Sequence, residues 1–352
     1  MLNLSKIMLC GSFCCVAFSA MAQDKLRIAA TPNPNLFPLF VALADDPSLP
    51  VEVVPIADGA EIDAVFAHGE ADALLAMTYT SAKKVTSGKV PDLRLVYVGF
   101  WQGFSEVTYQ ADHVKSFADL RGKGLIVAGP TGGGKNGGPD MFFQAALKRS
   151  GMSMADVSVC YLPVMEAVKL LKSHAPLNSN ARCDASFNFP ASGISLVEPA
   201  ATGLIMQGMM PLSGASSMER GIVMQSVFTG YQAWPQTQLP HGGLAVLGKV
   251  LDDPVAALRV KKVLDAYKKA AEKMRLAKGW AALRIAQTIS AGIAQTYPAY
   301  GLELPAAVVR VAMQRGNLVF RGDVTAEIQN DLQRFLTEVV GTAPPDSFYA
   351  LQ

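Results

Sequence analysis

The sequence predicts an α/β protein with two lobes, each built on a mainly parallel sheet with flanking helices, joined by a hinge. Short apolar runs alternate with helical patterns in the first hundred residues, the alternation begins again near residue 105, and the last hundred residues are mainly helical. Strands that alternate with helices are typical of a parallel sheet covered on both faces. A pattern that starts twice predicts two sheets, with a ligand cleft between them.

Residues 1–22 are predicted to be a secretory signal peptide. Lys6 precedes an apolar run, Ile7 to Met21, that ends in the small-x-small cleavage pattern Ala20-Met21-Ala22. The run is too short to span a membrane. A retained N-terminal anchor is the alternative, and a lipoprotein is disfavoured because no small residue directly precedes Cys10 or Cys14. We therefore expect a soluble periplasmic chain that begins near Gln23.

The first lobe is expected to comprise residues 23–102 and 240–352. Apolar runs predict its strands at 26–30, 51–56, 71–77 and 93–100, with helices at 37–43 and 59–68. Residues 244–247 are predicted to be the strand that returns the chain to this lobe. A long helix is predicted at 255–277, where Val, Leu and Ala recur at helical spacing with lysines on the other face.

The second lobe is expected to comprise residues 103–239. Its strands are predicted at 105–109, 125–128, 157–161 and 194–197, and its helices at 116–120, 141–149 and 165–173. Residues 174–193, rich in Asn, Ser and Pro, are predicted to be an irregular insertion.

Composition excludes several classes of function. Charged residues make up 17% of the chain and the formal net charge is +2, so the chain lacks the basic stripe that a nucleic-acid partner requires. The four histidines, at 68, 113, 174 and 241, are far apart and show no metal-ligand spacing. No G-x-S-x-G elbow is present. We expect no cofactor, no metal and no catalytic site, which matches a binding role.

A glycine-rich turn at residues 129–136 nearly fits the phosphate loop G-x-x-x-x-G-K-[ST]. Asn136 stands where a hydroxyl would coordinate magnesium, and an exported protein meets little ATP, so a nucleotide site is disfavoured. The turn instead suits a ligand loop, because successive backbone N–H groups at a helix N-terminus bind an anion or a carbonyl oxygen. Thr131, Gly133, Lys135 and Asn136 are its candidate ligand-binding residues, and a bare structural turn is the alternative.

Further candidates follow the strands, because ligands of open α/β sheets bind outside the carboxyl ends of the strands. The ligand-binding candidates chosen by this rule are Thr31, Asn33, Asn35, Thr78, Tyr79, Trp101 and Glu198. Each has a structural alternative. The residues at 31, 33 and 35 also suit a helix cap, the two aromatic residues also suit the core, and Glu198 also suits an ion pair at the hinge.

Lys135 is the only cation among these candidates, and one lysine neutralises a doubly charged anion poorly. A monoanion, or a neutral or zwitterionic ligand with an apolar part, is therefore expected. Cys160 and Cys183 are the two cysteines left after signal cleavage. They suit either a disulfide or two buried free thiols, since the sequence does not show how far apart they lie.

The chain resembles the nitrate/sulfonate/taurine-type substrate-binding proteins of ABC importers, which are themselves similar to thiamine-precursor-binding proteins. The matching segments, in order along the chain, begin at Leu26, Phe37, Gly69, Ser116, Val197 and Pro344. The resemblance implies a type II periplasmic-binding fold that closes on its ligand by hinge motion, with an ABC permease as partner, and such proteins usually work as monomers.

The residue pattern departs from the family in the glycine-rich turn and in the 174–193 insertion. Both lie on the second lobe, so the ligand does not carry over from the family. A small sulfonate-like or pyrimidine-like molecule is the expected ligand. The rival functions are an exported enzyme for a related molecule and a sensor that reports ligand occupancy to a membrane receptor.

Overall fold

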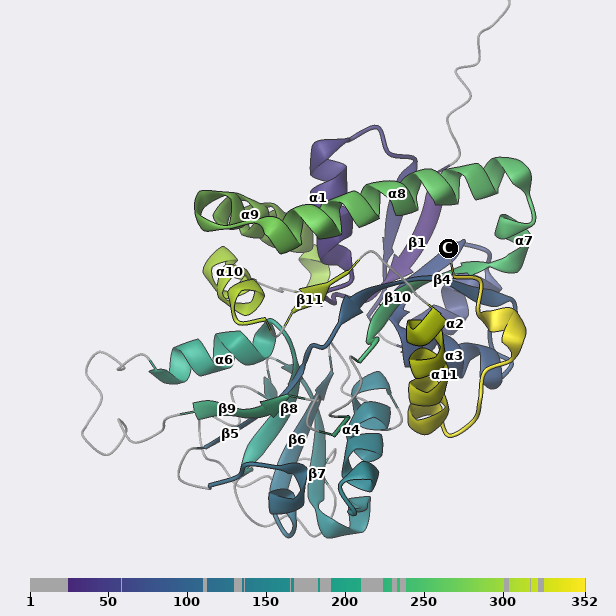
Figure 1. Ribbon diagram of the computed structural model, residues 1–352. Helices are drawn as coiled ribbons and strands as arrows, with labels where there is room; N and C mark the ends of the chain where they lie inside the picture. Colours follow the sequence, from purple (N-terminus) through teal and green to yellow (C-terminus); the bar gives the residue numbers. More distant parts are fainter. Residues whose placement is uncertain are drawn as a thin grey trace, which may run out of the picture.

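Two β-sheets, one above the other in Figure 1, form the framework of the computed structural model. The structure describes residues 25–57, 59–109, 113–129, 135, 137–164, 166–167, 183, 191–209, 224–229, 233–234, 239–300, 304–316, 318–321 and 326–351. The strand order is β11-β4-β10-β3-β1-β2 in the first sheet and β7-β6-β8-β5-β9 in the second.

Four strands of the first sheet run in one direction: β1 (Leu26–Ala30), β2 (Val51–Pro55), β3 (Ala73–Met77) and β4 (Leu93–Trp101). The other two run against them, β10 (Gly242–Leu247) between β3 and β4, and β11 (Val319–Phe320) at the edge. β3 and β10 are buried along their whole length. This matches their near-continuous apolar sequences, which are typical of strands covered on both faces.

The second sheet follows the same plan. β6 (Gly124–Gly129), β7 (Ser158–Pro163), β8 (Gly193–Val197) and β9 (Met224–Thr229) share one direction, and β5 (Phe104–Tyr109) runs against them. β5 and β10 are the strands that the chain enters directly after passing from one sheet to the other. β5 and β10 both begin at the edge of the sheet where the parallel strands have their carboxyl ends. Because they run away from this edge, they are antiparallel to their neighbours.

Helices cover both faces of each sheet. On the first sheet, α8 (Pro254–Leu276) packs on one face together with α1 (Leu36–Asp45) and α9 (Gly279–Thr296), and α3 (Thr78–Thr86) packs on the other. On the second sheet, α4 (Gly138–Arg149) and α6 (Ala200–Met209) cover opposite faces. The other helices among the described residues are α2 (Gly59–Ala67), α7 (Gly248–Leu251), α10 (Ala306–Gln314), α11 (Ala326–Val340) and the short 3₁₀ turns η2 (Phe117–Leu120), η3 (Met154–Asp156), η7 (Pro298–Tyr300) and η8 (Asp346–Phe348).

Most sequence-predicted elements are confirmed, with shifts of a few residues. The helix predicted at 255–277 corresponds to α8, whereas β9 and β11 were not predicted, because β11 is very short and β9 lies in a stretch without clear periodicity. The predicted helix at 165–173 and the 174–193 insertion fall mostly outside the described residues. Cys183, which is described, forms a disulfide with Cys160 of β7. Among the described residues, no helix is long and apolar enough to cross a membrane.

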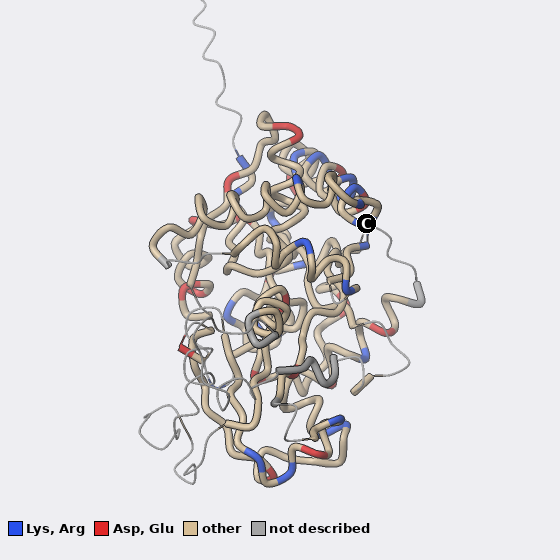
Figure 2. Tube along the Cα trace, turned by 90° about the vertical axis from the view of Figure 1, so that its left-hand side faces the viewer, with Lys and Arg blue, Asp and Glu red and all other residues tan. Residues whose placement is uncertain are grey.

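α8 shows how the sequence specifies a helix. Its buried residues recur every three or four positions from Ala256 to Met274, and its lysine and arginine positions lie at the top of the molecule in Figure 2. At its start, Asp253 accepts hydrogen bonds from the N–H groups of Val255 and Ala256, and Pro254 occupies the first position, where a missing N–H costs nothing.

The Asp253 cap leads to a first prediction. Replacing Asp253 by Ala leaves two helix N–H groups without their acceptor, and we expect a loss of about 1 kcal/mol in the free energy of unfolding. Asp253→Asn is the matched control, because an asparagine oxygen accepts the same hydrogen bonds. Urea denaturation followed by circular dichroism measures both. Equal losses in the two variants would contradict the capping role.

Candidate ligand-binding site

The carboxyl ends of the parallel strands of both sheets meet at a seam, which we define as the region crossed by residues 102–103 and 239–241. The backbone N–H of Gln102 donates to the carbonyl of Leu239 (3.0 Å), so the two crossing segments are bonded to each other. Gly103 has a φ of 157°, and a Cβ there would lie 2.1 Å from the Phe100 ring. The first crossing therefore needs glycine at this position.

At the start of α1, the three polar candidates bind one another. Asn33 Oδ1 accepts from the backbone N–H of Asn35 (2.9 Å) and from Asn35 Nδ2 (2.7 Å), while Asn33 Nδ2 donates to the carbonyl of Thr31 (2.8 Å). Both asparagines are buried. Asn35 Oδ1 is buried and, within the described part of the chain, lacks a hydrogen-bond partner. The group therefore shapes the turn before α1 and keeps one acceptor unused.

Thr78 and Tyr79 open α3 and differ in their contacts. Thr78 holds the second crossing segment, since its hydroxyl donates to the carbonyl of Pro240 (2.6 Å) and its N–H donates to the carbonyl of His241 (2.7 Å). The Tyr79 hydroxyl is buried without a partner among the described residues, and burial raises the pKa of Tyr79 well above its ordinary value. Tyr79 thus brings an unused hydroxyl to the seam.

The N-termini of α3 and α4 meet across the seam. A Cβ on Gly138, at the start of α4, would lie 3.1 Å from the Tyr79 ring and 3.1 Å from the Thr80 hydroxyl. Residues of the two sheets are therefore in close contact here. Two helix N-termini that meet also place positive backbone dipole ends together, which favours an anionic or electron-rich group nearby.

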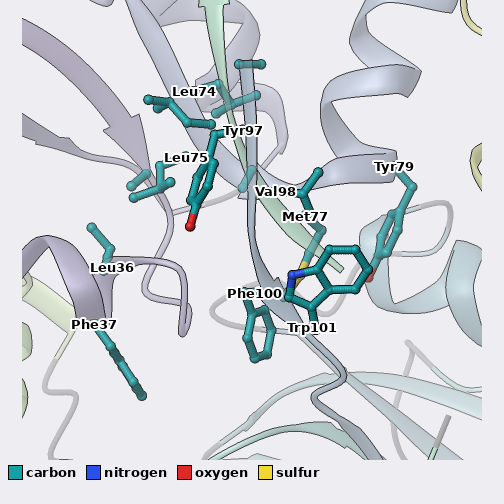
Figure 3. Packing of buried hydrophobic residues seen from close by; sticks show 14 of the residues in the cluster. Leu36, Phe37, Leu74, Leu75, Met77, Tyr79, Tyr97, Val98, Phe100 and Trp101 are labelled. Carbon is teal, nitrogen blue, oxygen red and sulfur yellow. The ribbon is translucent and has the colours of Figure 1, made fainter. Parts of the chain in front are cut away.

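Trp101 lies at the end of β4, buried at 1% exposure, and its indole N–H has no partner among the described residues. In Figure 3, Trp101 and the neighbouring Phe100 leave β4 in different directions. The guanidinium of Arg321, just after β11, lies 6.0 Å from the Trp101 ring centroid. The sequence did not point to Arg321, because it is distant in sequence and joins Trp101 only through the pairing of β11 with β4.

Glu198 forms hydrogen bonds with residues of the second sheet and of α6. Its Oε1 accepts from the hydroxyl of Ser105 (3.1 Å) and its Oε2 accepts from the N–H of Thr202 in the first turn of α6 (3.0 Å). The side chain is buried at 1% exposure. These bonds stabilise the start of α6, and the ion pair weighed from sequence stays a prediction.

The glycine-rich turn is described at one candidate position. Lys135 is exposed, whereas Thr131, Gly133 and Asn136 lie outside the described residues. α4 follows the turn, as expected for a helix N-terminal ligand loop. Whether the turn binds a ligand stays a prediction.

A group of seven aromatic side chains fills one side of the seam. We call it the His241 cluster, and its members are Tyr79, Phe100, Phe104, Phe142, Trp234, His241 and Phe335. The shortest ring-centroid distance is 4.6 Å, between the stacked rings of Phe104 and Phe142, and the edge of His241 contacts Phe142 at 4.8 Å. Edge-to-face and offset contacts of this kind are the favourable arrangements of aromatic rings.

His241 itself is fully buried, and neither ring nitrogen has a hydrogen-bond partner in the described parts of the chain. Burial lowers the pKa of His241 to about 3, so the imidazole is neutral at physiological pH. Each buried polar group left without a partner costs about 1–3 kcal/mol. Sequence analysis dismissed His241 as an isolated histidine. Its position just before the predicted return strand is a signal that could have placed it at the seam.

Glu106 is a second buried group with an oxygen that accepts no hydrogen bond from the described residues. It lies opposite Ser195 in the pairing of β5 with β8, is 2% exposed, and its Oε1 has no partner among the described residues. Burial raises the pKa of Glu106 to about 7, and the nearby Ser195 hydroxyl offsets this only partly. A strand pattern of apolar residues gave no signal for a protonatable carboxyl at this position.

The C-terminal helix α11 binds α4 beside the cluster. Glu338 of α11 accepts from Arg149 of α4 (2.8 Å) and from the indole N–H of Trp234 (2.9 Å), and the Arg149 guanidinium lies 5.4 Å from the Trp234 ring centroid. Arg149 is therefore neutralised by Glu338. The contact links a helix of the second sheet to one that also packs on α3.

The architecture is that of the periplasmic binding proteins, and the expected fold class is confirmed. SsuA of Escherichia coli, a periplasmic aliphatic sulphonate-binding protein, is similar with a TM-score of 0.59 at 16% identity, over 89% of this chain and 85% of that one. The alkanesulfonate-binding protein SsuA of Xanthomonas axonopodis pv. citri, bound to MOPS, is similar with a TM-score of 0.60 at 15% identity, over 94% of this chain and 98% of that one.

The fold also carries catalysis. The desulfurization enzyme DSZB is similar to this chain with a TM-score of 0.53 at 13% identity, over 94% of this chain and 97% of the enzyme. No family model and no curated protein sequence matches the chain. At these identities the likeness establishes the fold, and function has to be argued from the site.

Proposed function

We propose that this protein is the solute-binding component of an ABC importer. It is exported to the periplasm through a cleaved signal peptide, works as a monomer and delivers its ligand to a permease in the membrane. Its lobes are residues 23–102 with 240–352, and residues 103–239. It captures a small anionic or zwitterionic organic molecule, sulfonate-like or pyrimidine-like, by closure of the two lobes, and it is not an enzyme.

The observation that carries this proposal is the seam. The parallel strands of both sheets end there, only two short segments joined by the Gln102–Leu239 hydrogen bond cross it among the described residues, and unpartnered buried polar groups collect beside them. Two bodies joined by short crossings can rotate apart and close on a ligand, and closure is favoured by contacts that only the closed form makes.

The charges near the seam suit a ligand with one negative charge and an apolar part. Arg321 lies against Trp101, and Lys135 belongs to the loop that leads into α4. The lysine and arginine positions of α8 lie at the top of the molecule, at the end away from the second sheet (Figure 2). The sulfonates named for the two SsuA proteins have this character, which supports testing them first.

A thermal-shift panel tests the proposal. Purified protein is heated with taurine, methanesulfonate, benzenesulfonate, nitrate, bicarbonate, uracil and benzoate in turn. A ligand at a hundred times its Kd adds about 2.7 kcal/mol to the stability and raises the melting temperature. The stabilisation by an anion should weaken in Arg321→Gln and Lys135→Ala but persist in Lys89→Ala, an exposed control in the turn after α3. Failure of every compound to stabilise the protein would count against a solute-binding role.

The alternative is an exported enzyme, which the shared fold of DSZB favours. Incubating the protein with each stabilising compound and analysing the mixture by mass spectrometry separates the two. A binding protein returns the compound unchanged, and a product that accumulates beyond one equivalent of protein establishes an enzyme.

A further inference from the structure

The seam contains hydrogen-bonding groups that the protein does not use. Both nitrogens of His241 and the hydroxyl of Tyr79 are buried without partners among the described residues, and their rings lie 6.2 Å apart in an edge-to-face contact. Buried polar groups in proteins are nearly always hydrogen-bonded. Several unmade bonds at one place therefore indicate a group that arrives from outside.

The rings around His241 come from both halves of the molecule. Tyr79 of α3, Phe100 of β4 and Phe335 of α11 lie with the first sheet, while Phe104 of β5 and Phe142 of α4 lie with the second. Movement of one sheet away from the other separates these two sets. The space between them then has flat, apolar walls and one polar centre, which is His241 on the second crossing segment.

We propose that His241, together with Tyr79, recognises an uncharged hydrogen-bonding group on a planar ring of the ligand, which inserts between the two sets of aromatic side chains. This inference rests on the proposed function and specifies which part of the ligand the cluster binds. Tyr79 was one of the strand-end candidates of the sequence, whereas His241 was not a candidate.

The chemistry of the cluster determines the class of ligand. A neutral imidazole offers one N–H donor and one acceptor nitrogen, and a tyrosine hydroxyl can do either. A ring amide or a ring nitrogen beside an N–H matches this pair, and its faces suit aromatic stacking. Burial holds the pKa of His241 at about 3, so the imidazole supplies no positive charge to a bound anion.

A charged group of the ligand stays outside the cluster. The one described cation in contact with it, Arg149 beside Trp234, is already paired with Glu338. Arg321 lies against Trp101, which is not a member of the cluster. An alkyl sulfonate accepts hydrogen bonds, but it has no ring to stack between the aromatic side chains and no uncharged donor for the acceptor nitrogen of His241.

Calorimetric titration with four probes tests the inference. Uracil and nicotinamide are neutral rings with a donor and an acceptor, benzenesulfonate is a ring with a charge only, and methanesulfonate has no ring. We expect uracil or nicotinamide to bind the wild type, and to bind His241→Phe at least tenfold more weakly. Phenylalanine keeps the ring packing and removes both nitrogens. Tyr79→Phe, which removes only the hydroxyl, should weaken binding by a smaller factor.

A spectroscopic readout separates recognition from structural support. The chain has four histidines, so ring-¹⁵N-histidine spectra are simple, and the signal missing in His241→Phe identifies His241. The bound probe should shift that signal and leave the other three in place. The melting temperature of ligand-free His241→Phe should equal or exceed that of the wild type, because the variant buries no unpartnered nitrogen.

Three results would overturn the inference. They are that neither uracil nor nicotinamide binds the wild type, that the bound probe has the same affinity for His241→Phe, or that the ¹⁵N signal of His241 does not shift when a probe binds. If methanesulfonate binds wild type and His241→Phe equally while the neutral rings are silent, the solute-binding function stands and only this inference fails. If a neutral ring binds through His241 and is chemically converted, the inference stands and the proposed function fails.

Discussion

Between pH 4.5 and 6.5 we expect two buried groups to change the stability of this protein in opposite directions, so that their effects cancel in the wild type. The groups are His241 in the seam and Glu106 on β5, opposite Ser195 of β8. When one of the two groups is replaced, the free energy of unfolding should show the pH dependence that the remaining group causes. The titration of each group then becomes measurable.

His241 stabilises the folded state less as the pH falls. Burial lowers its pKa from 6.5 to about 3. Below pH 6.5 the imidazole is therefore protonated in the unfolded chain but stays neutral in the folded chain. Stability from this group is complete above pH 6.5 and is lost as the pH falls toward 3. The free energy of unfolding therefore rises with pH across this window by about 1.4 kcal/mol per pH unit.

Glu106 has the opposite sign. Burial raises its pKa from 4.5 to about 7, so above pH 4.5 the unfolded chain releases a proton that the folded chain keeps. Stability from this group is complete below pH 4.5 and is lost as the pH rises through 7. The carboxylates of Asp72, Asp119 and Asp156 have pKa values lowered from 3.8 and titrate below this window.

Urea denaturation at half-unit steps of pH gives the measurement. Across pH 4.5 to 6.5, Glu106→Gln should gain about 2 kcal/mol of stability and His241→Phe should lose about 2 kcal/mol, because the full slope of about 1.4 kcal/mol per pH unit falls by half at the pKa of the unfolded state. The double variant should be as flat as the wild type. Parallel curves for the two single variants would show that the buried groups do not titrate as described.

Loss of the disulfide should have the second large effect. Cys160 is fully buried in β7 and is bonded to Cys183, 23 residues further along the chain. Closing a loop of this size restricts the unfolded chain and contributes about 3 kcal/mol. We expect Cys160→Ala with Cys183→Ala to lower the denaturation midpoint accordingly, and dithiothreitol to lower that of the wild type to a similar value.

The double alanine variant is also the control for the reductant, since dithiothreitol should not affect it. Mass spectrometry after alkylation verifies that the wild-type bond has been reduced. A fully reduced wild type with an unchanged midpoint would show that the bond adds nothing to the stability.

Several parts of the site followed from sequence because they depend on local rules. Thr78, Tyr79 and Trp101 were chosen since they follow apolar runs, and strand ends in an open sheet meet at one edge. All three lie at the ends of β3 and β4, beside the crossing segments. The return strand at 244–247 was also expected from its apolar run, and it is the central part of β10.

The residues that the sequence missed act through contacts between distant segments. Arg321 reaches Trp101 only because β11 pairs with β4, and Glu338 reaches Arg149 only because α11 packs against α4. Neither residue stands in a motif or follows a recognisable strand. The antiparallel direction of β5 and β10 was likewise missed, because direction depends on the edge at which the chain re-enters a sheet.

The sequence by itself determined which segments form strands and helices, because the period of the apolar residues is a local property of the chain. Tertiary structure alone decided the chemistry of the seam. Glu106 and His241 are ordinary ionisable residues in sequence, and their protonation changes only when packing removes them from water. Burial depends on every segment that surrounds a residue, so it cannot be assigned until all of those segments are in place.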